Sequence, residues 1–435
     1  MSLWSAAATA ADRTPDTRNR YVDFLRAVSI MAVISGHWLI ASPYVDAGQV
    51  SLTSMLAERP WTQWLTWVFQ VMPVFFLVGG FANGVSWNAA KRDGRSYADW
   101  LNARLQRLIG PVLPLLIAWA VIAAVAHRMG VDPAMIKAGS QMALVPTWFL
   151  AVYIMVVTVV PVTYAAWQRF GMRSFWVLVI VAVVDDALFF AADLQVVGWA
   201  NYAFIWLSVH QLGYAWHDGR IAGPRTALPW AVLGAAALGL MVTVGPYPLS
   251  MVSVPGETLS NSLTPKLPML ALGLVQTGLL LAVEAPVRRW LVRPVRWTAT
   301  VLVNGMIMTI FLWHLTASTL VVGLSLLVGN VGLTLEPGSG VWWSVRPIWM
   351  LVYVTALVPF ALAFGRFERG GRGGDARAWR LVLGAALVCG GLAVLALDGV
   401  GGDGLFGLRV GALALPFAGA ALAGVLRVPR RAKEK

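Results

Sequence analysis

Seven ionisable side chains fall within stretches that are otherwise apolar enough to cross a membrane. They are Asp23, Arg26, His37, Asp185, Asp186, His210 and His314. A charged group is costly to place among lipid chains, so such residues face a partner or a water-filled cavity and are the first candidates for function. A histidine can accept or donate a proton near neutral pH, and an arginine can hold a phosphate.

Arg26 and His37 are the most informative pair. Eleven steps of about 100° bring them to within about 20° of one helical face, roughly 16 Å apart along the axis. With the N-terminus inside, Arg26 lies near the cytoplasmic surface and His37 in the outer half, which predicts a polar path across the membrane. The alternative is that Arg26 reaches lipid phosphates or pairs with Asp23 while His37 bonds a neighbouring helix. Their shared face favours the functional interpretation.

A second basic pair, Arg104 and Arg107, has the spacing Arg-x-x-Arg at the expected cytoplasmic start of a span. This spacing puts two guanidinium groups on one side of a helix, where they suit a phosphate- or pyrophosphate-bearing ligand such as coenzyme A. Anchoring by the positive-inside rule explains the same two residues without a ligand.

The tract from Val71 to Gly84 contains Pro73, Gly79 and Gly80 among aliphatic and aromatic residues. Gly80 and Gly84 form a Gly-x-x-x-Gly pair, which is typical of closely packed membrane helices. A broken helix that lines a cavity would use the same residues. The sequence leaves both interpretations open.

The composition and the apolar runs of the chain predict the structural elements that position these residues. The chain has 435 residues, of which 58% are hydrophobic and only 12% charged, and its mean hydropathy is +0.70. Soluble domains carry about 25% charged residues, so we predict an all-α, polytopic integral membrane protein. The apolar runs predict twelve membrane helices, at 21–40, 62–87, 107–126, 145–165, 174–192, 199–216, 228–247, 267–284, 301–328, 346–365, 380–397 and 405–426.

The distribution of the 33 Lys and Arg residues is one-sided, and it accounts for the net charge of +13 without a nucleic-acid partner. With the N-terminus inside, six of these residues fall on the opposite side: Arg59, Arg128, Lys137, Lys266, Arg346 and Arg409. We therefore predict that both termini are cytoplasmic. A chain rich in Arg, Ala, Val and Gly is typical of a high-GC bacterium, so the expected location is the inner or plasma membrane of a bacterial cell. The single cysteine, Cys389, and the scattered histidines predict no metal site.

The expected organisation has five parts. They are a cytoplasmic tail (1–20), a membrane domain (21–365), a cytoplasmic loop (366–379), two additional membrane helices (380–426) and a basic cytoplasmic tail (427–435). The two additional helices are rich in Ala, Gly and Leu, and they could pack on the domain or form an oligomer contact.

Three tracts together resemble those of the acyltransferase family 3 membrane enzymes. Arg26-x10-His37 is similar to the basic-x10-His signature of that family, Phe75–Phe81 to its Phe-Phe-x-x-Ser/Gly-Gly-Phe tract, and Arg104–Arg107 to its Arg-x-x-Arg. Trp148-Phe-Leu150 and Phe311-Leu-Trp-His314-Leu are weaker matches. The resemblance covers about residues 20–365.

The resemblance implies an enzyme that moves an acyl group from cytoplasmic acyl-CoA, with acetyl-CoA the expected donor, to a hydroxyl of an extracytoplasmic glycan, glycolipid or glycoside. On this basis His37 would act as general base or as transient acyl carrier. Arg26, Arg104 and Arg107 would bind the phosphates or thioester end of the donor. Membrane lipid is the other expected partner.

One departure from the family pattern concerns the partner of the histidine. Many members follow the Trp-x-Leu tract with a carboxylate, whereas this chain continues as Ala151-Val-Tyr153-Ile. Tyr153 could supply a hydrogen bond, or Asp185 or Asp186 could supply the charge. Adjacent helical residues point about 100° apart, so only one aspartate is expected to face the cavity. His314 could be a second catalytic histidine or a packing residue.

A proton-coupled secondary transporter is the alternative from another class of function. Twelve spans with intramembrane Asp185, Asp186 and His210, and helices interrupted by Pro and Gly, are also transporter features. Transporters commonly have two corresponding halves, and the two halves of this chain do not correspond. The length of the acyl chain and the identity of the acceptor stay open at this stage.

Overall fold

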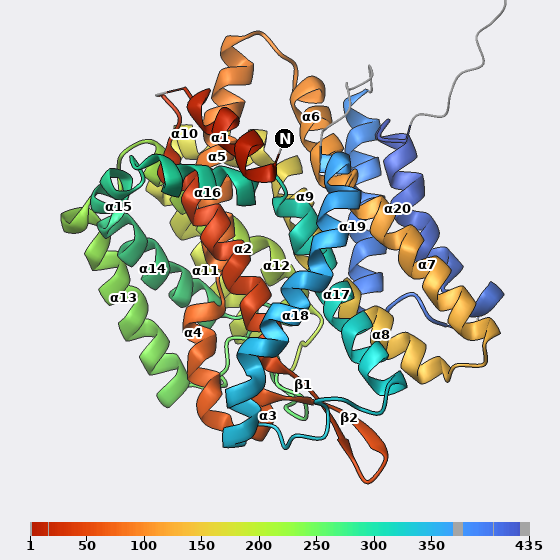
Figure 1. Cartoon of the computed structure of the whole chain (residues 1–435). Helices are drawn as coiled ribbons and strands as arrows, with labels where there is room; N and C mark the ends of the chain where they lie inside the picture. The colour runs from red at the N-terminus through yellow and green to blue at the C-terminus, as the bar shows by residue number, and fades with distance from the viewer. Residues whose placement is uncertain (1, 16, 369–376, 403, 427–435) are drawn as a thin grey trace, which may run out of the picture. The chain divides into compact units, whose positions relative to one another are not determined.

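The computed structural model describes residues 2–15, 17–368, 377–402 and 404–426. The expected basic tail at 427–435, and most of the expected loop at 366–379, therefore lie outside the described residues. The described part of the chain is mostly helical (Figure 1). Its contacts divide it into two compact units.

The first unit contains residues 1–86, 160–307 and 322–352. Its central helices are α2 (Arg20–Ile40), α5 (Met72–Arg92) and α12 (Asn201–His217). Its other α-helices are α1 (Leu3–Asp12), α3 (Met55–Glu58), α4 (Thr66–Phe69), α10 (Val160–Phe170), α11 (Met172–Ala191), α13 (Pro224–Thr243), α14 (Leu267–Ala282), α15 (Glu284–Trp290) and α16 (Pro294–Asn304). Two 3-10 helices, η1 (Pro60–Leu65) and η2 (Val197–Ala200), complete it.

The second unit contains residues 87–159, 308–321 and 353–435. Its helices are α6 (Tyr97–Ile109), α7 (Val112–Arg128), α8 (Pro133–Leu144), α9 (Thr147–Thr158), α19 (Ala378–Asp398) and α20 (Val410–Leu422), with short 3-10 helices η3 (Gly365–Glu368) and η4 (Leu405–Gly407). The long helices α17 (Ile307–Leu327) and α18 (Gly340–Phe364) contribute to both units. Within the second unit, α19 packs against α9 and α20. The chain passes from one unit to the other within α5, α17 and α18 and at the junction between α9 and α10.

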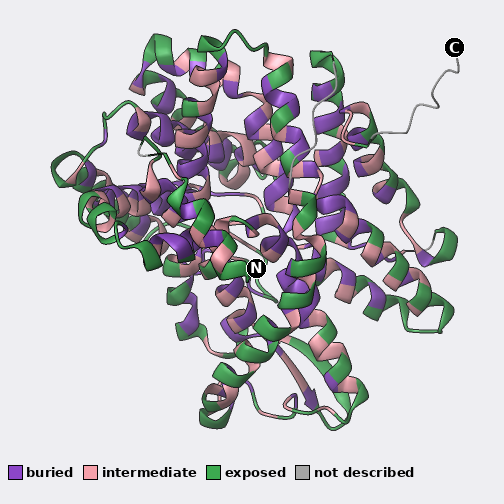
Figure 2. Cartoon of the chain, turned by 45° about the horizontal axis from the view of Figure 1, so that its top comes forward, coloured by how far each residue is buried: buried purple, intermediate pink, exposed green. Residues whose placement is uncertain are grey.

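The distribution of apolar side chains is that of a membrane protein. On α11, Val177, Ile180 and Val184 lie along one helical face and are 58%, 60% and 51% exposed, whereas Asp185 and Asp186 on the same helix are buried. Figure 2 shows exposed and buried residues alternating in this way around the helices. Exposed apolar stripes and buried polar groups are expected where the surrounding solvent is lipid.

The number of spans differs from the expected twelve. Eight described helices are long and apolar enough to cross a membrane, or up to ten if each of two bent pairs counts as one span. The helix expected at 405–426 is the short α20, with 13 residues. The segment expected at 145–165 is divided between α9 and α10, and α9 instead forms a bent pair with α8. The chain is thus a multi-pass helical membrane protein, and the structure does not confirm the count of twelve.

A β-hairpin is the exception to the predicted all-α fold. Strands β1 (Ala41–Asp46) and β2 (Gln49–Ser54) pair antiparallel directly after α2. Ala47 and Gly48, between the strands, both have positive φ, as a two-residue hairpin turn of type I′ requires. The sequence analysis predicted a span that ends at residue 40 and the next that begins at residue 62, and it assigned no element to the segment between them. The backbone amide of Val45 also donates to the carbonyl of Leu333, at 2.8 Å.

Candidate functional site

Helix α2 carries the two residues on which the prediction depends. It runs unbroken from Arg20 to Ile40, so Arg26 and His37 lie on one helix and, by its periodicity, near one face. Asn19 begins the helix, because its side-chain oxygen accepts from the backbone amides of Tyr21 and Val22. No proline lies between the two basic residues, and the helix stays continuous through Gly36, where an added Cβ would lie 3.5 Å from the side chain of Phe69.

The arginine end of α2 is an ion-pair cluster. Arg18 donates twice to the carboxylate of Asp23, at 2.5 and 3.0 Å, and Arg26 lies 3.9 Å from the same carboxylate. The pKa of Arg18 is raised, because the effect of its hydrogen bonds to Asp23 is larger than the opposite effect of burial. Because Arg18 holds Asp23 more closely, Arg26 is only weakly neutralised, and 39% of its side chain is exposed. Arg26 is thus available to a second anion.

The histidine end of α2 is held by a buried arginine. Arg346, on α18 and only 6% exposed, donates from its Nη2 to the carbonyl of Trp38, at 3.1 Å, and to that of Ala41. Carbonyls at the C-terminal end of a helix need partners from outside the helix, and a cation placed there also stabilises the helix dipole. Arg346 therefore fixes the last turn of α2, which carries His37. The sequence analysis placed Arg346 only by its charge and missed this contact.

The glycine tract is a close contact between α5 and α12. A Cβ added at Gly80 would lie 1.9 Å from the carbonyl oxygen of His210, and one added at Gly213 would lie 2.2 Å from the carbonyl oxygen of Leu77. Two helix backbones can approach this closely only where both helices have glycine at the point of contact. Helix α5 is continuous from Met72 to Arg92, so the structure favours the packing interpretation over a broken helix.

Two further residues of this tract face α12. The side-chain nitrogen of Asn83 lies 3.1 Å from Nε2 of His210, whose ring is fully buried. A Cβ at Gly84 would contact Tyr214 and His217. His210 of α12 is therefore hydrogen-bonded to Asn83 of α5, within the contact between these two helices.

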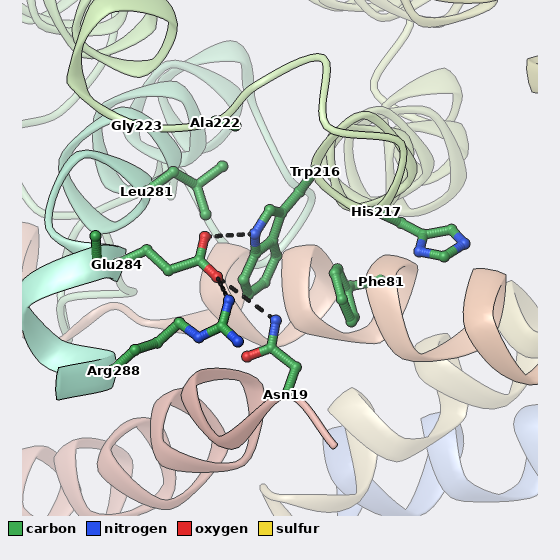
Figure 3. Close-up of a pocket in the computed structure, with 10 residues that line it drawn as sticks. Asn19, Phe81, Trp216, His217, Ala222, Gly223, Leu281, Glu284 and Arg288 are labelled. Atoms are coloured by element: carbon green, nitrogen blue, oxygen red, sulfur yellow. Dashed lines mark hydrogen bonds and ion pairs between the residues drawn. The ribbon is translucent and has the colours of Figure 1, made fainter. Parts of the chain in front are cut away.

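The same contact places Phe81 in the wall of a pocket. The pocket has a volume of about 530 Å³, and Figure 3 shows the side chains around it. Its lining residues are Asn19, Phe81, Trp216, His217, Ala222, Gly223, Leu281, Glu284, Ala285 and Arg288. The Phe81 ring lies 4.5 Å from that of Trp216 and 5.5 Å from that of His217, measured between centroids. The sequence analysis did not identify this pocket, because its walls come from four segments that are distant in the sequence.

Glu284 is the carboxylate of this pocket. Trp216 donates from Nε1 to one of its oxygens, at 2.8 Å, while Asn19 Nδ2 and Arg288 Nη1 lie 3.5 and 3.7 Å from the other. Figure 3 shows these groups converging on the carboxylate. Glu284 thus connects the start of α15 with the end of α12 and with Asn19, the residue that begins α2.

The two aspartates of α11 belong to a separate buried network. Asp186 accepts from Asn201 at 3.0 Å, from Tyr247 at 2.9 Å and from the backbone amide of Leu267 at 2.8 Å. Lys266, which is fully buried, lies 4.0 Å from Asp186 and over the ring of Phe189. Burial lowers the pKa of Lys266, and the carboxylates of Asp186 and Asp185 act in the opposite direction. These bonds tie α11 and α12 to the start of α14.

Asp185 differs from its neighbour. It is 6% exposed, and one of its two side-chain oxygens has no hydrogen-bond partner among the described residues. The expectation that only one of the two aspartates faces the cavity, and a catalytic role for either one, stay predictions.

The arginines of the second predicted basic pair lie within α6 rather than at the start of the following helix. A capping box between Ser96 and Asp99 begins α6 at Tyr97, ten residues earlier than expected. Arg104 lies over the ring of Trp100, at 5.6 Å, and Arg107 is exposed in the last turn. Arg107 therefore lies where a cation is favoured by the helix dipole, whereas Arg104 lies one turn earlier.

Tyr153 and His314 are connected through aromatic rings in the second unit. Tyr153 stacks on Phe149, Phe149 contacts the edge of Phe311, and Phe311 stacks on His314. His314 is fully buried, and its Nδ1 lies 2.6 Å from the carbonyl oxygen of Phe311. This arrangement suits the packing role that the sequence analysis left open for His314.

The predicted site residues are thus distributed over both units. Arg26, His37, Asp185 and Asp186 belong to the first unit. Arg104, Arg107, Tyr153 and His314 belong to the second. Within the described ranges, no three His, Cys, Asp or Glu side chains gather as metal ligands would. Inside the first unit, the residues that contact one another around a cavity are those of the pocket between Asn19 and Arg288.

Comparison with known proteins gives the family. The model of the acyltransferase domain called Acyl_transf_3 matches residues 19–366, which include Arg26, His37, the glycine tract and the pocket. Neither the curated proteins nor the solved structures gave a match. The matched region contains most of the helices that are able to span a membrane. The chain therefore belongs to acyltransferase family 3 and is a multi-pass membrane acyltransferase.

Proposed function

We propose that this enzyme moves an acyl group, with acetyl the first candidate, from cytoplasmic acyl-CoA to a hydroxyl of an extracytoplasmic glycan, glycolipid or glycoside. The proposal rests mainly on α2, one unbroken helix that carries a half-exposed arginine near one end and a histidine near the other. The rise of a helix separates them by roughly 16 Å along the axis. Such a helix can bring a donor and an acceptor to one path from opposite sides of the membrane.

In this proposal Arg26 binds the donor and His37 acts on the acceptor. When His37 is the general base, its ring nitrogen takes the proton of the acceptor hydroxyl as that oxygen attacks the thioester carbonyl. The C–O bond forms, the C–S bond breaks, and the coenzyme A thiolate leaves and takes up a proton. Alternatively His37 itself accepts the acyl group and then passes it to the hydroxyl.

Supporting roles follow from the contacts described above. Arg346 positions the turn that carries His37, and Asp23, which is held by Arg18, orients Arg26 and neutralises it only weakly. Arg104 and Arg107 are proposed to contribute positive charge to donor binding, and Tyr153, Asp185 or Asp186 to orient the histidine. We further propose that both termini are cytoplasmic, as the distribution of Lys and Arg suggests.

The test is transfer of label from radioactive acetyl-CoA into the glycans and lipids of membranes that contain the full chain. We expect His37→Ala to lower the rate by at least about 100-fold, the usual contribution of a general base. We expect Arg26→Gln to raise the KM for acetyl-CoA. The control is His127→Ala, at an exposed histidine of α7. Mass spectrometry then identifies the acylated product.

Two results would contradict this proposal. If no glycan, lipid or glycoside acquires label in wild-type membranes, the donor or the acceptor class is wrong. If the His37→Ala variant, present at normal abundance, transfers at the wild-type rate, then the assignment of His37 is wrong.

A further inference from the structure

The pocket between Asn19 and Arg288 has no role in the mechanism proposed above, yet its construction is that of a ligand site. Its volume of about 530 Å³ lies within the range of about 300–1,000 Å³ that is usual for small-molecule pockets. Phe81, Trp216 and Leu281 give it an apolar wall, whereas Asn19, Glu284 and Arg288 provide polar groups at its edge. A mixed lining of this kind suits a ligand with a flat apolar face and a few polar positions.

Glu284 restricts the class of ligand. A carboxylate only accepts hydrogen bonds, and it repels phosphate. One of its oxygens is held firmly by Trp216, at 2.8 Å, while the other has only the long contacts to Asn19 and Arg288. The second oxygen can therefore accept from an amine of the ligand. A lipid phosphate placed beside Glu284 would instead be repelled.

The aromatic wall indicates a planar ring. Nucleobases stack readily on aromatic side chains, and their exocyclic amines donate to carboxylates. Arg288, with 55% of its side chain exposed, lies at the open edge of the pocket, where it can contact a phosphate that remains outside. The pocket thus offers a stacking surface, an acceptor for an amine and, farther out, a cation.

The position of the pocket connects it to α2. Asn19 both lines the pocket and begins α2, and Arg26 follows seven residues later, about 10 Å along the helix axis. The extended pantetheine arm of coenzyme A is longer than this separation. A base in the pocket therefore places the pantetheine arm beside the arginine half of α2, and the remaining length of the helix to His37, eleven residues or about 16 Å beyond Arg26, is what the thioester end and the acceptor together have to span.

We propose that this pocket binds the adenine of acyl-CoA, with Phe81 and Trp216 against the ring, Glu284 accepting from its exocyclic amine and Arg288 on the adjoining phosphates. This inference rests on the proposed function, because it takes acyl-CoA as the donor. It adds the base-binding part of the donor site and gives a role to the last residue of the Phe75–Phe81 tract.

The experiment compares two donors on the purified full-length protein in lipid nanodiscs. Equilibrium binding is measured for radiolabelled acetyl-CoA and for acetyl-pantetheine, which lacks the adenine nucleotide. Wild type should bind acetyl-CoA more tightly. In Phe81→Leu, Glu284→Gln and Arg288→Gln, this preference should fall about tenfold, an ordinary effect for a residue that contacts a ligand. Because Glu284→Gln disturbs contacts inside the protein, Phe81→Leu provides a variant that leaves the carboxylate intact.

Matched controls are Glu257→Gln and Arg293→Gln, which change an exposed carboxylate and an exposed guanidinium outside the pocket lining. Both should keep the wild-type preference. Adenosine 3′,5′-bisphosphate should displace acetyl-CoA from wild type and do so about tenfold less well from the Phe81→Leu variant, whereas inorganic pyrophosphate should displace it from both to the same extent.

The outcomes separate the two proposals. If wild type binds neither donor, then the proposed function fails and the adenine assignment fails with it. If wild type prefers acetyl-CoA and the pocket variants keep that preference, the pocket is not the adenine site, whereas the proposed function stands. Equal affinity of wild type for the two donors would also overturn the adenine assignment alone.

Discussion

At the scale of single residues, Gly80 shows how one position controls a helix contact. Its place in a Phe-Phe-x-x-Gly-Gly-Phe tract does not reveal whether the glycine serves chemistry or packing. The structure answers this, because the backbone of α12 occupies the space that a Cβ would need. The neighbouring residue Phe81 then depends on this contact for its position in the pocket wall.

We therefore expect Gly80→Ala to destabilise the protein by about 3 kcal/mol, the upper part of the usual range for overpacking. The reason is the 1.9 Å between the added Cβ and the carbonyl oxygen of His210. Thermal unfolding in detergent checks this. The matched control is Gly239→Ala on α13, where a Cβ would meet nothing within 4 Å and alanine favours the helix. Equal unfolding temperatures for the two variants would refute the contact.

For His37 and Arg26, the sequence predicts the position of the side chains but does not determine their chemical roles. Their types and spacing suffice to predict one helical face, because helical periodicity is local. Their chemical roles stay predictions, since a role depends on the groups that surround the donor and the acceptor. The transfer assay with His37→Ala addresses that question directly.

At the scale of elements, Asp186 and Lys266 hold three helices together. The pair lies between α11, α12 and the start of α14, and both side chains are almost completely buried. Two buried charges stabilise each other only while both are present. The charge of Asp186 within a membrane helix, which is also a transporter feature, thus has a structural explanation in its pairing with Lys266.

Replacing only one member of this pair should be costly. We expect Asp186→Asn to destabilise the protein by about 3–5 kcal/mol, because it leaves the Lys266 ammonium buried without its counter-charge. Since burial already lowers the pKa of Lys266, the variant should lose most stability at low pH and regain some as pH rises through that pKa. The double variant Asp186→Asn with Lys266→Met should recover part of the loss. Unfolding followed at several pH values tests the sign, and a loss independent of pH would contradict it.

The β-hairpin and Arg346 form another element-scale feature. The hairpin follows α2 directly, and Arg346 bonds carbonyls at the junction between them. A long-range contact of this kind, from residue 346 to residues 38 and 41, leaves no signal in the local sequence. Only the folded chain shows that the His37 turn is supported from α18.

At the scale of the whole chain, the sidedness of the membrane protein can be tested. The proposed orientation places the N-terminus inside and the hairpin outside. We expect a Cys389→Ala variant that also carries Gln49→Cys, at an exposed hairpin position, to react with a membrane-impermeant maleimide in intact cells. The corresponding variant with Ala10→Cys, exposed on α1, should react only after the membrane is opened. The reverse pattern would invert the topology and with it the assignment of donor and acceptor sides.

The sequence by itself determined the membrane class, the helical fold and the family, because hydropathy, charge distribution and short motifs are local properties. It also located α11, α14 and α19 to within a few residues, since long apolar runs end at clear polar signals. Its count of twelve membrane helices is not confirmed, and it missed the hairpin, since short segments adopt the structure that their neighbours allow. The tertiary structure alone decided that Gly80 is a packing residue, that Asp186 pairs with Lys266, and that Phe81, Trp216 and Glu284 surround one pocket. Each of these depends on segments far apart in the chain, which only folding brings into contact.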